Sequence, residues 1–428
     1  MNEIEAVGAE AVLTATAHRE SSAPDRPERP WIFGFLIAPS AVVANGVVQG
    51  GTLAYLLSRQ GIGSGDQSKL IDFLALPTIF YFLWSPITDF LVRRRTWLLI
   101  GGVLAGILMA LGFHQPSLTS SGAEVLMLIS ACLSQLVVSA CGGMMGALHS
   151  ERSKRVAGSF YQAGSLGFGA LSVSVLLWLS SRVSRDALGL AAATIIAVPA
   201  LFALAAPPQG DISTGSFART MGNILREFKA TFLRWEAIPY TLCMLFPMAS
   251  GAAISLLTGV AKSYGLNGDS VAWMNGLFGG LLMAAGSIAA TAVPVRVSAP
   301  VAYLSAGVIN AATLAVLWLG PMTPTTYLLG VTLYLLTVGF AYGFFTAVVL
   351  EFLGASGKSG SGRYSIINSL GNIPVLYMIR LDGWGGDHFG PRGLSATECV
   401  VGGLGGTLLL SYFLLRRKPA PAAAASTA

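Results

Sequence analysis

The stretch "SPITDFLVRRRTW" places one carboxylate beside a cluster of guanidinium groups. Asp89 stands four to six residues before Arg93, Arg94 and Arg95. Groups of opposite charge can pair in one conformation of a protein and separate in another, which would make this stretch a switch. The alternative is a static ion pair at a surface, which contributes only about 0–1 kcal/mol to stability.

Glu351 is a second candidate for a switchable ion pair, because Arg296 and Arg363 lie in the segments on either side of it. Carboxyl groups that are partly buried can also take up and release protons near neutral pH. Three acidic residues near apolar runs are candidates for proton coupling: Asp72, Glu351 and Glu398. All three lie closer to the end of a run than to its centre, so an anchoring role at an interface is the alternative.

Uncharged polar and aromatic side chains form a second set of candidates. Asn45 and Gln49 are one helical turn apart, as are Asn368 and Asn372, so each pair shares a helix face. Such groups either bind a ligand or hold helices together, and Trp84 either stacks on a ligand or packs. Their concentration favours a ligand site, and without a central Lys or Arg it suits a polar or amphipathic ligand. The candidate binding residues are Asn45, Gln49, Tyr81, Trp84, Gln135, Tyr161, Gln162, Asn368 and Asn372.

Other residue types that carry chemistry do not assemble into a site. The loop "GASGKSGSGR" contains Gly-Lys-Ser but lacks the earlier glycine of a phosphate-binding loop. The four cysteines lie in apolar runs without metal-ligand spacing, and the four histidines are scattered. No nucleophile occurs with a base and an orienting group. We therefore expect no catalytic residue, no metal and no cofactor, apart from the coupling to protons considered above.

The elements that carry these residues are apolar helices. The chain of 428 residues is 54% hydrophobic and 11% charged, and its mean hydropathy of +0.67 is too apolar for a water-exposed surface. About 20 apolar residues cross the hydrocarbon core of a bilayer as a helix. We predict an all-α integral membrane protein with twelve spans, at residues 32–57, 68–91, 96–114, 122–149, 156–180, 187–207, 238–264, 270–293, 298–319, 325–352, 364–380 and 395–415.

The distribution of Lys and Arg predicts the orientation, because cytoplasmic loops hold most of the positive charge. The basic clusters fall on one side if both termini are cytoplasmic. The pI of about 9.2 then reflects membrane topology rather than binding to nucleic acid. The segments 1–30 and 416–428 are predicted to be disordered cytoplasmic tails, and neither contains the apolar core of a signal peptide.

A repeated phrase divides the spans into two sets. "GSFYQAGSLG" begins at Gly158 in span five, and "GRYSIINSLG" begins at Gly362 in span eleven, the fifth of the second set. The long polar connection at 208–237 separates the two sets and has the pattern of an amphipathic helix on the inner membrane surface. We predict two pseudo-symmetric bundles of six helices, at 31–207 and 238–415, with a site between them.

The stretch at Asp89 resembles the signature G-x-x-x-D-R-x-G-R-[RK]-[RK] of the major facilitator superfamily. Ser85, Phe90 and Val92 depart from that signature. Within the superfamily, "FYFLWSPITD", "GSFYQAGSLG" and "RYSIINSLGNIPVLYMIRLDGWGGDHFG" are similar to the peptide, acetyl-CoA and drug transporter group, which includes muropeptide permeases and siderophore importers. The resemblance extends over all twelve spans.

The resemblance implies a secondary active transporter of the bacterial cytoplasmic (inner) membrane. It implies a monomer surrounded by membrane lipid that works by alternating access and imports a small molecule of medium size, muropeptide-like or siderophore-like. Efflux of drugs or metabolites is the alternative within the superfamily. A receptor that moves nothing and a membrane enzyme are the alternatives outside it.

Overall fold

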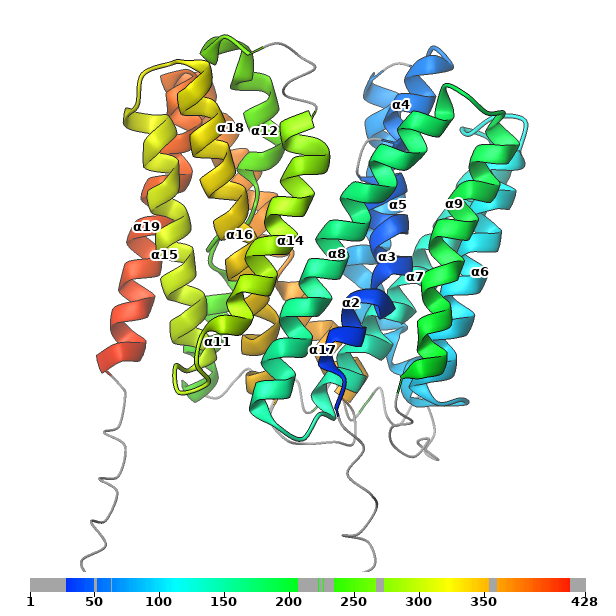
Figure 1. Ribbon diagram of the computed structural model, residues 1–428, viewed down its shortest axis with the longest axis horizontal. Helices are drawn as coiled ribbons and strands as arrows, with labels where there is room; N and C mark the ends of the chain where they lie inside the picture. Colours follow the sequence, from blue (N-terminus) through cyan, green and yellow to red (C-terminus); the bar gives the residue numbers. More distant parts are fainter. Residues whose placement is uncertain are drawn as a thin grey trace, which may run out of the picture.

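The computed structural model describes residues 28–49, 52–62, 64–206, 222, 226, 235–266, 273–353 and 360–415. These parts of the chain are helical and contain no β-strand, which confirms the predicted all-α class. The predicted tails and the predicted amphipathic helix in 208–237 lie almost wholly outside the described residues. Figure 1 shows two bundles of helices side by side, the first made from α2 to α9 and the second from α11 to α19.

The first bundle contains predicted spans one to six. Its elements are η1 (Pro30–Ile32), α2 (Phe33–Leu36), α3 (Ala38–Ala41), η2 (Val42–Val48), α4 (Thr52–Arg59), α5 (Ser64–Phe80), η3 (Tyr81–Leu83), η4 (Ser85–Asp89), α6 (Arg94–His114), α7 (Ser121–Gly146), α8 (Glu151–Ser180), α9 (Arg185–Ala200) and η5 (Leu201–Ala205). Three helices begin after a serine whose hydroxyl accepts a hydrogen bond from a backbone amide of the first turn, namely Ser120, Ser150 and Ser184. These caps set where α7, α8 and α9 begin.

The second bundle contains predicted spans seven to twelve. Its elements are η6 (Trp235–Ala237), α11 (Ile238–Leu245), α12 (Ala253–Val260), η7 (Ala261–Tyr264), η8 (Met274–Phe278), α14 (Gly279–Ala289), η9 (Ala290–Ala292), α15 (Ala299–Leu319), α16 (Pro324–Leu353), α17 (Gly360–Leu370), α18 (Ile373–Phe389) and α19 (Pro391–Leu415). The described chain begins before α2 and ends after α19 on the same side of the molecule (Figure 1). We call this the terminal side.

Among the described residues, eight helical segments are long and apolar enough to cross a membrane. The other predicted spans are divided into shorter helices. Span seven breaks between α11 and α12, where Pro247 lies and where Ala249 and Gly251 have φ values of 47° and 74°. Proline cannot donate a backbone hydrogen bond, and a positive φ ends a right-handed helix. The break therefore gives span seven a local bend.

The predicted boundary of span eleven is wrong. We expected it to end at residue 380, but α18 continues to Phe389. Arg380, Asp382 and the glycines that follow resemble a loop in the sequence, whereas in the structure they form more than two further helical turns. Asp382 is consequently inside a helix, and its side chain is completely buried.

Among the described residues, the buried hydrophobic cluster that contains residues of both bundles lies toward the terminal side. One cluster unites Tyr81, Cys141 and Tyr161 of the first bundle with Phe344 and Tyr364 of the second. The other two clusters each belong to a single bundle and lie toward the opposite side. They contain Phe113 and Leu188 in the first bundle and Tyr327 and Leu394 in the second.

Candidate functional site

Hydrogen bonds between side chains of one bundle and groups of the other lie on the terminal side. They use the halves of α7, α8 and α16 that lie nearer that side, together with α17, residues of α5, η3 and α14 and the residue before α18. We call the ten residues that form the five bonds below the terminal-side interface. The bonds run from Gln162 Nε2 to Thr346 Oγ1 (2.9 Å), from Asn368 Nδ2 to Tyr81 Oη (3.0 Å), from Asn372 Nδ2 to the Thr78 carbonyl (3.2 Å), from Ser365 Oγ to Ser139 Oγ (3.1 Å) and from Ser287 Oγ to the Ser159 carbonyl (2.8 Å).

Four predicted binding residues belong to this interface: Gln162, Asn368, Asn372 and Tyr81. The two asparagines share a face, as their spacing indicated, since both donate to the second span. Tyr161 is buried beside them in the shared core. Their amides and hydroxyls are therefore used between the bundles in this conformation, and they become available to a ligand only when the bundles separate here.

The remaining predicted binding residues lie within the first bundle. Asn45 Nδ2 is 3.4 Å from Ser165 Oγ, Trp84 Nε1 donates to the Cys132 carbonyl (3.2 Å), and Gln135 Nε2 is 3.5 Å from Ser40 Oγ. Gln49 has an exposed side chain at the end of η2. Asn45 and Trp84 are half-buried, and Gln135 is buried. Apart from the exposed Gln49, the structure thus separates the predicted set into residues between the bundles and residues that join helices of one bundle.

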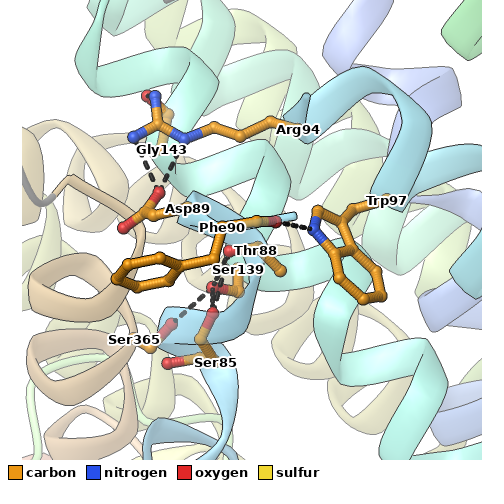
Figure 2. Close-up of polar contacts among 9 residues, drawn as sticks. All are labelled: Ser85, Thr88, Asp89, Phe90, Arg94, Trp97, Ser139, Gly143 and Ser365. Atoms are coloured by element: carbon orange, nitrogen blue, oxygen red, sulfur yellow. Dashed lines mark hydrogen bonds and ion pairs between the residues drawn. The ribbon is translucent and has the colours of Figure 1, made fainter. Parts of the chain in front are cut away.

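The carboxylate of Asp89 pairs with Arg94 of the same bundle. Arg94 Nη2 and Nε lie 2.8 Å and 2.9 Å from Asp89 Oδ1, and Arg94 Nη1 donates to the Gly143 carbonyl (3.2 Å). Figure 2 shows this pair where η4 meets α7 and α17. Arg93 is exposed and Arg95 is half-buried, and neither forms an ion pair within the described residues. The pair therefore holds the end of span two against α6 and α7 of the same bundle. Its connection to the terminal-side interface runs through η4.

A chain of hydroxyl groups next to this ion pair connects η4 to the second bundle. Thr88 Oγ1 lies 3.2 Å from Ser139 Oγ, which donates to the Ser85 carbonyl and accepts from Ser365 of α17 (Figure 2). Thr88, Ser139 and Ser365 are all fully buried. Buried hydroxyls need such partners, because an unpaired one is costly. These hydroxyl residues are not predictable from the sequence, since small residues in apolar spans give no distinctive pattern.

Two further contacts hold the ends of helices on the terminal side. Arg155 of α8 donates to the carbonyls of Pro294 and Val297 in the second bundle. Glu351, at the end of α16, accepts from Tyr240 Oη (3.3 Å) and from the backbone amide of Ala299 (3.1 Å).

The predicted partners of Glu351 differ from those observed. Arg296 forms no ion pair with Glu351, and the side chain of Arg363 lies outside the described residues. Glu351 instead holds the start of α15 against the end of α16 through the Ala299 amide, where a carboxylate is favoured by the helix N-terminus.

The candidates for proton coupling differ in their surroundings. Asp72 is exposed and Glu351 is half-buried, whereas Glu398 is 2% exposed. Glu398 accepts from Tyr334 Oη (2.7 Å) and from the Ala253 amide (3.1 Å). Of the three, Glu398 alone is enclosed by protein.

We expect Asn368→Ala to loosen the terminal-side interface. A hydrogen bond contributes about 0.5–1.5 kcal/mol, so the bundles should separate roughly 2- to 10-fold more often. Cys141 is fully buried in the shared core, and a thiol reagent reaches it only after such a separation. The measurement is the labelling rate of Cys141 after replacement of Cys132, Cys243 and Cys399 by alanine. Asn45→Ala is the matched control, since Asn45 bonds within one bundle; equal acceleration in both variants would contradict the assignment.

Comparisons with known proteins bear on the fold. No protein-family model and no curated protein matches the sequence. Solved structures do match. One is the proton:xylose symporter XylE bound to 6-bromo-6-deoxy-D-glucose, which is described as a major facilitator superfamily protein. The match has a TM-score of 0.60 and 14% sequence identity, and it covers 90% of this chain and 94% of the symporter chain. This chain has the major facilitator fold. The human organic anion transporter MFSD10 (TETRAN) matches the same fold with a TM-score of 0.61 at 16% identity, over 90% of this chain and 100% of its own.

The major facilitator fold and the apolar helices together establish a multi-pass membrane protein. The match to this fold agrees with the predicted arrangement of two helical bundles. Sequence identities of 14% and 16% show a shared fold but do not identify a substrate. The predicted membership of the peptide, acetyl-CoA and drug transporter group therefore stays a prediction.

Proposed function

We propose that this protein is a secondary active transporter that moves a medium-sized polar or amphipathic solute by alternating access. The observation that carries the proposal is the asymmetry of the core. One hydrophobic cluster crosses between the bundles on the terminal side, while toward the opposite side each bundle has a cluster of its own. Two rigid bodies joined at one end can rock about the joined region and expose a site to either side in turn.

The polar residues between the bundles are uncharged, which favours a largely uncharged solute. Gln162, Asn368 and Asn372 offer amides, and Tyr81 and Tyr161 offer aromatic surface and hydroxyls. Amides complement the hydroxyl, amide and hydroxamate groups of muropeptide-like and siderophore-like molecules. A small dianion would require a central Lys or Arg, and the guanidinium of Arg155 is engaged with backbone carbonyls at the end of α8.

Import is the proposed direction. With the termini in the cytoplasm, as the charge distribution predicts, the described conformation is closed toward the cytoplasm. A site between the bundles would then accept solute from outside. Efflux of drugs or metabolites remains the competing direction, and the experiment below distinguishes it.

A thermal-shift screen followed by transport assays tests the proposal. Purified protein would be screened against muropeptides, metal chelates, acyl-CoA esters and cationic drugs, because a ligand that binds the folded state raises its apparent Tm. We expect a muropeptide or a chelate to stabilise the protein and to accumulate in vesicles above its equilibrium level. If a cationic drug accumulates in inverted vesicles and no compound accumulates in right-side-out vesicles, the result would favour efflux. Chemical conversion of the compound, or binding without movement, would overturn the proposal in favour of an enzyme or a receptor.

A further inference from the structure

A pair of buried carboxyl groups lies in the second bundle, away from the terminal-side interface. Asp382 of α18 is 0% exposed and Glu398 of α19 is 2% exposed. The two side chains lie close to each other. They lie on neighbouring helices whose backbones come close together at Gly385 and Gly393. Glu398 is a candidate from the sequence, whereas Asp382 is not, since the predicted span ends before it.

The two carboxyl groups have unequal surroundings. Glu398 Oε1 accepts from Tyr334 Oη at 2.7 Å, and Oε2 accepts from the Ala253 amide at 3.1 Å. Neither oxygen of Asp382 receives a hydrogen bond from a described donor. A carboxylate with two donors is stabilised as the anion, while a buried carboxyl without donors favours the neutral acid. The unequal donors therefore favour the anion at Glu398 over the anion at Asp382, so a single proton shared by the pair would reside on Asp382, whose O–H would donate to Glu398.

No positive charge compensates the pair. Within the described residues, no Lys, Arg or His forms an ion pair with either group. The titratable groups that face the pair come from α16, namely Tyr334 and Tyr342, and α12 contributes only its backbone amide. On α18 itself, Arg380 and Asp387 are exposed. Two buried anions in contact would repel each other strongly, so a bound cation or a proton is required.

A second buried polar group points to the same place. Ser395 stands three residues before Glu398 on α19, which puts both on one helix face. It is 1% exposed, and its Oγ has no hydrogen-bond partner among the described residues.

Close packing favours a proton as the occupant, because a proton needs no volume. A sodium ion would need a shell of oxygen ligands with room for it.

The pair also touches the break in span seven. Ala253, whose amide is held by Glu398, is the first residue of α12 and directly follows the break that contains Ala249 and Gly251. Tyr342 of α16 donates to the carbonyl of Ser250 in the same break (2.6 Å). A change of charge at Asp382, beside Glu398, would therefore act through Glu398 on the point where α12 can bend against α11.

We propose that Asp382 and Glu398 form a proton-binding pair that controls the bend of span seven and so couples proton movement to the rocking of the bundles. When the proton leaves to water, Asp382 becomes a second carboxylate, and the pair carries two negative charges. The repulsion separates α18 from α19 and weakens the hold of Glu398 on α12. This coupling rests on the proposed transport function, whereas the presence of the proton does not.

Infrared spectroscopy of the purified protein in lipid nanodiscs reads the proton directly. We expect the band of a protonated carboxyl group at neutral pH in the wild type and its loss in Asp382→Asn. Asp66→Asn is the matched control, because Asp66 is exposed and paired with Lys69; its spectrum should keep the band. Absence of the band from the wild type would overturn the proposal, whether or not the protein transports a solute.

Tyr334→Phe provides a second test that keeps both carboxyl groups. It removes a donor that stabilises the anion of Glu398, so the proton should be held more tightly. The pH at which half of the protonated-carboxyl band is lost should therefore rise by roughly one to two pH units. A midpoint that stays in place or falls would contradict the assignment.

Coupling is tested by the distance between spin labels at Gln60 and Lys262, two exposed residues on the side opposite the termini. The distance should change between mildly acidic and alkaline pH in the wild type and become independent of pH in Asp382→Asn. A response to sodium at constant pH, without a response to pH, would identify a sodium site instead. A protonated band with pH-independent distances would show a structural proton without coupling, which also overturns the proposal.

Discussion

Gly142→Ala is expected to move the protein out of the conformation that is closed on the terminal side. A Cβ atom at position 142 would overlap the ring of Tyr364 across the interface between the bundles. Tyr364 is fully buried, so its ring cannot turn aside into solvent. Overpacking of this kind costs about 1–3 kcal/mol. Because the overlap exists only while the bundles are joined there, the conformational equilibrium should shift roughly 5- to 150-fold toward separation.

The labelling rate of Cys141 measures this shift, in protein whose three other cysteines are replaced. Gly146→Ala is a matched control on the same helix, because its Cβ would meet only Leu350 Cδ2, at 4.0 Å. Both substitutions raise the helix propensity of α7 equally. We expect faster labelling in the first variant alone, with its Tm close to that of the control. Unfolding of Gly142→Ala without an intermediate open state would show that the bundles do not separate at this surface.

Arg94→Gln is expected to destabilise the protein by about 3–5 kcal/mol, the usual effect of removing one partner of a buried ion pair. The side chains of Arg94 and Asp89 are only 14% and 5% exposed. Without the guanidinium, the carboxylate of Asp89 would be buried without a counter-ion, since its Oδ2 has no other described partner. The Gly143 carbonyl would also lose a donor. Thermal unfolding in detergent should show a large fall in Tm.

Two variants separate this effect from a general loss of positive charge. Arg93 is exposed, so Arg93→Gln should change stability by no more than about 0.5 kcal/mol. The double variant Asp89→Asn with Arg94→Gln removes the buried charge and should recover part of the lost stability. Equal losses in the Arg93 and Arg94 variants would mean that the ion pair contributes only as a surface pair.

The sequence predicted the helices better than the contacts between them. The runs that became α6, α7, α8, α15 and α16 are long and apolar, and lipid leaves such a run no alternative to a helix. The break of span seven was not predicted, because Pro247 and Gly251 are common residues in membrane helices, and only the positive φ values reveal the bend. The polar residues after 380 predict the end of span eleven, although protein, rather than water, surrounds Asp382.

The candidate site was predictable only in part for a related reason. Helical spacing was enough to put Asn368 and Asn372 on one face, and both reach the second span. Spacing could not show that Asn45 faces Ser165 of its own bundle while Gln162 faces Thr346 of the other. That distinction depends on how the helices rotate when they pack.

The central claim is that the two bundles rock as rigid bodies, so that one side closes as the other opens. Pulsed electron paramagnetic resonance tests it most directly, with one pair of spin labels at the exposed residues Arg152 and Arg296 on the terminal side and another at Gln60 and Lys262 on the opposite side. Introducing Gly142→Ala should lengthen the first distance and shorten the second. Two distances that stay unchanged, or that lengthen together, would contradict alternating access in this protein.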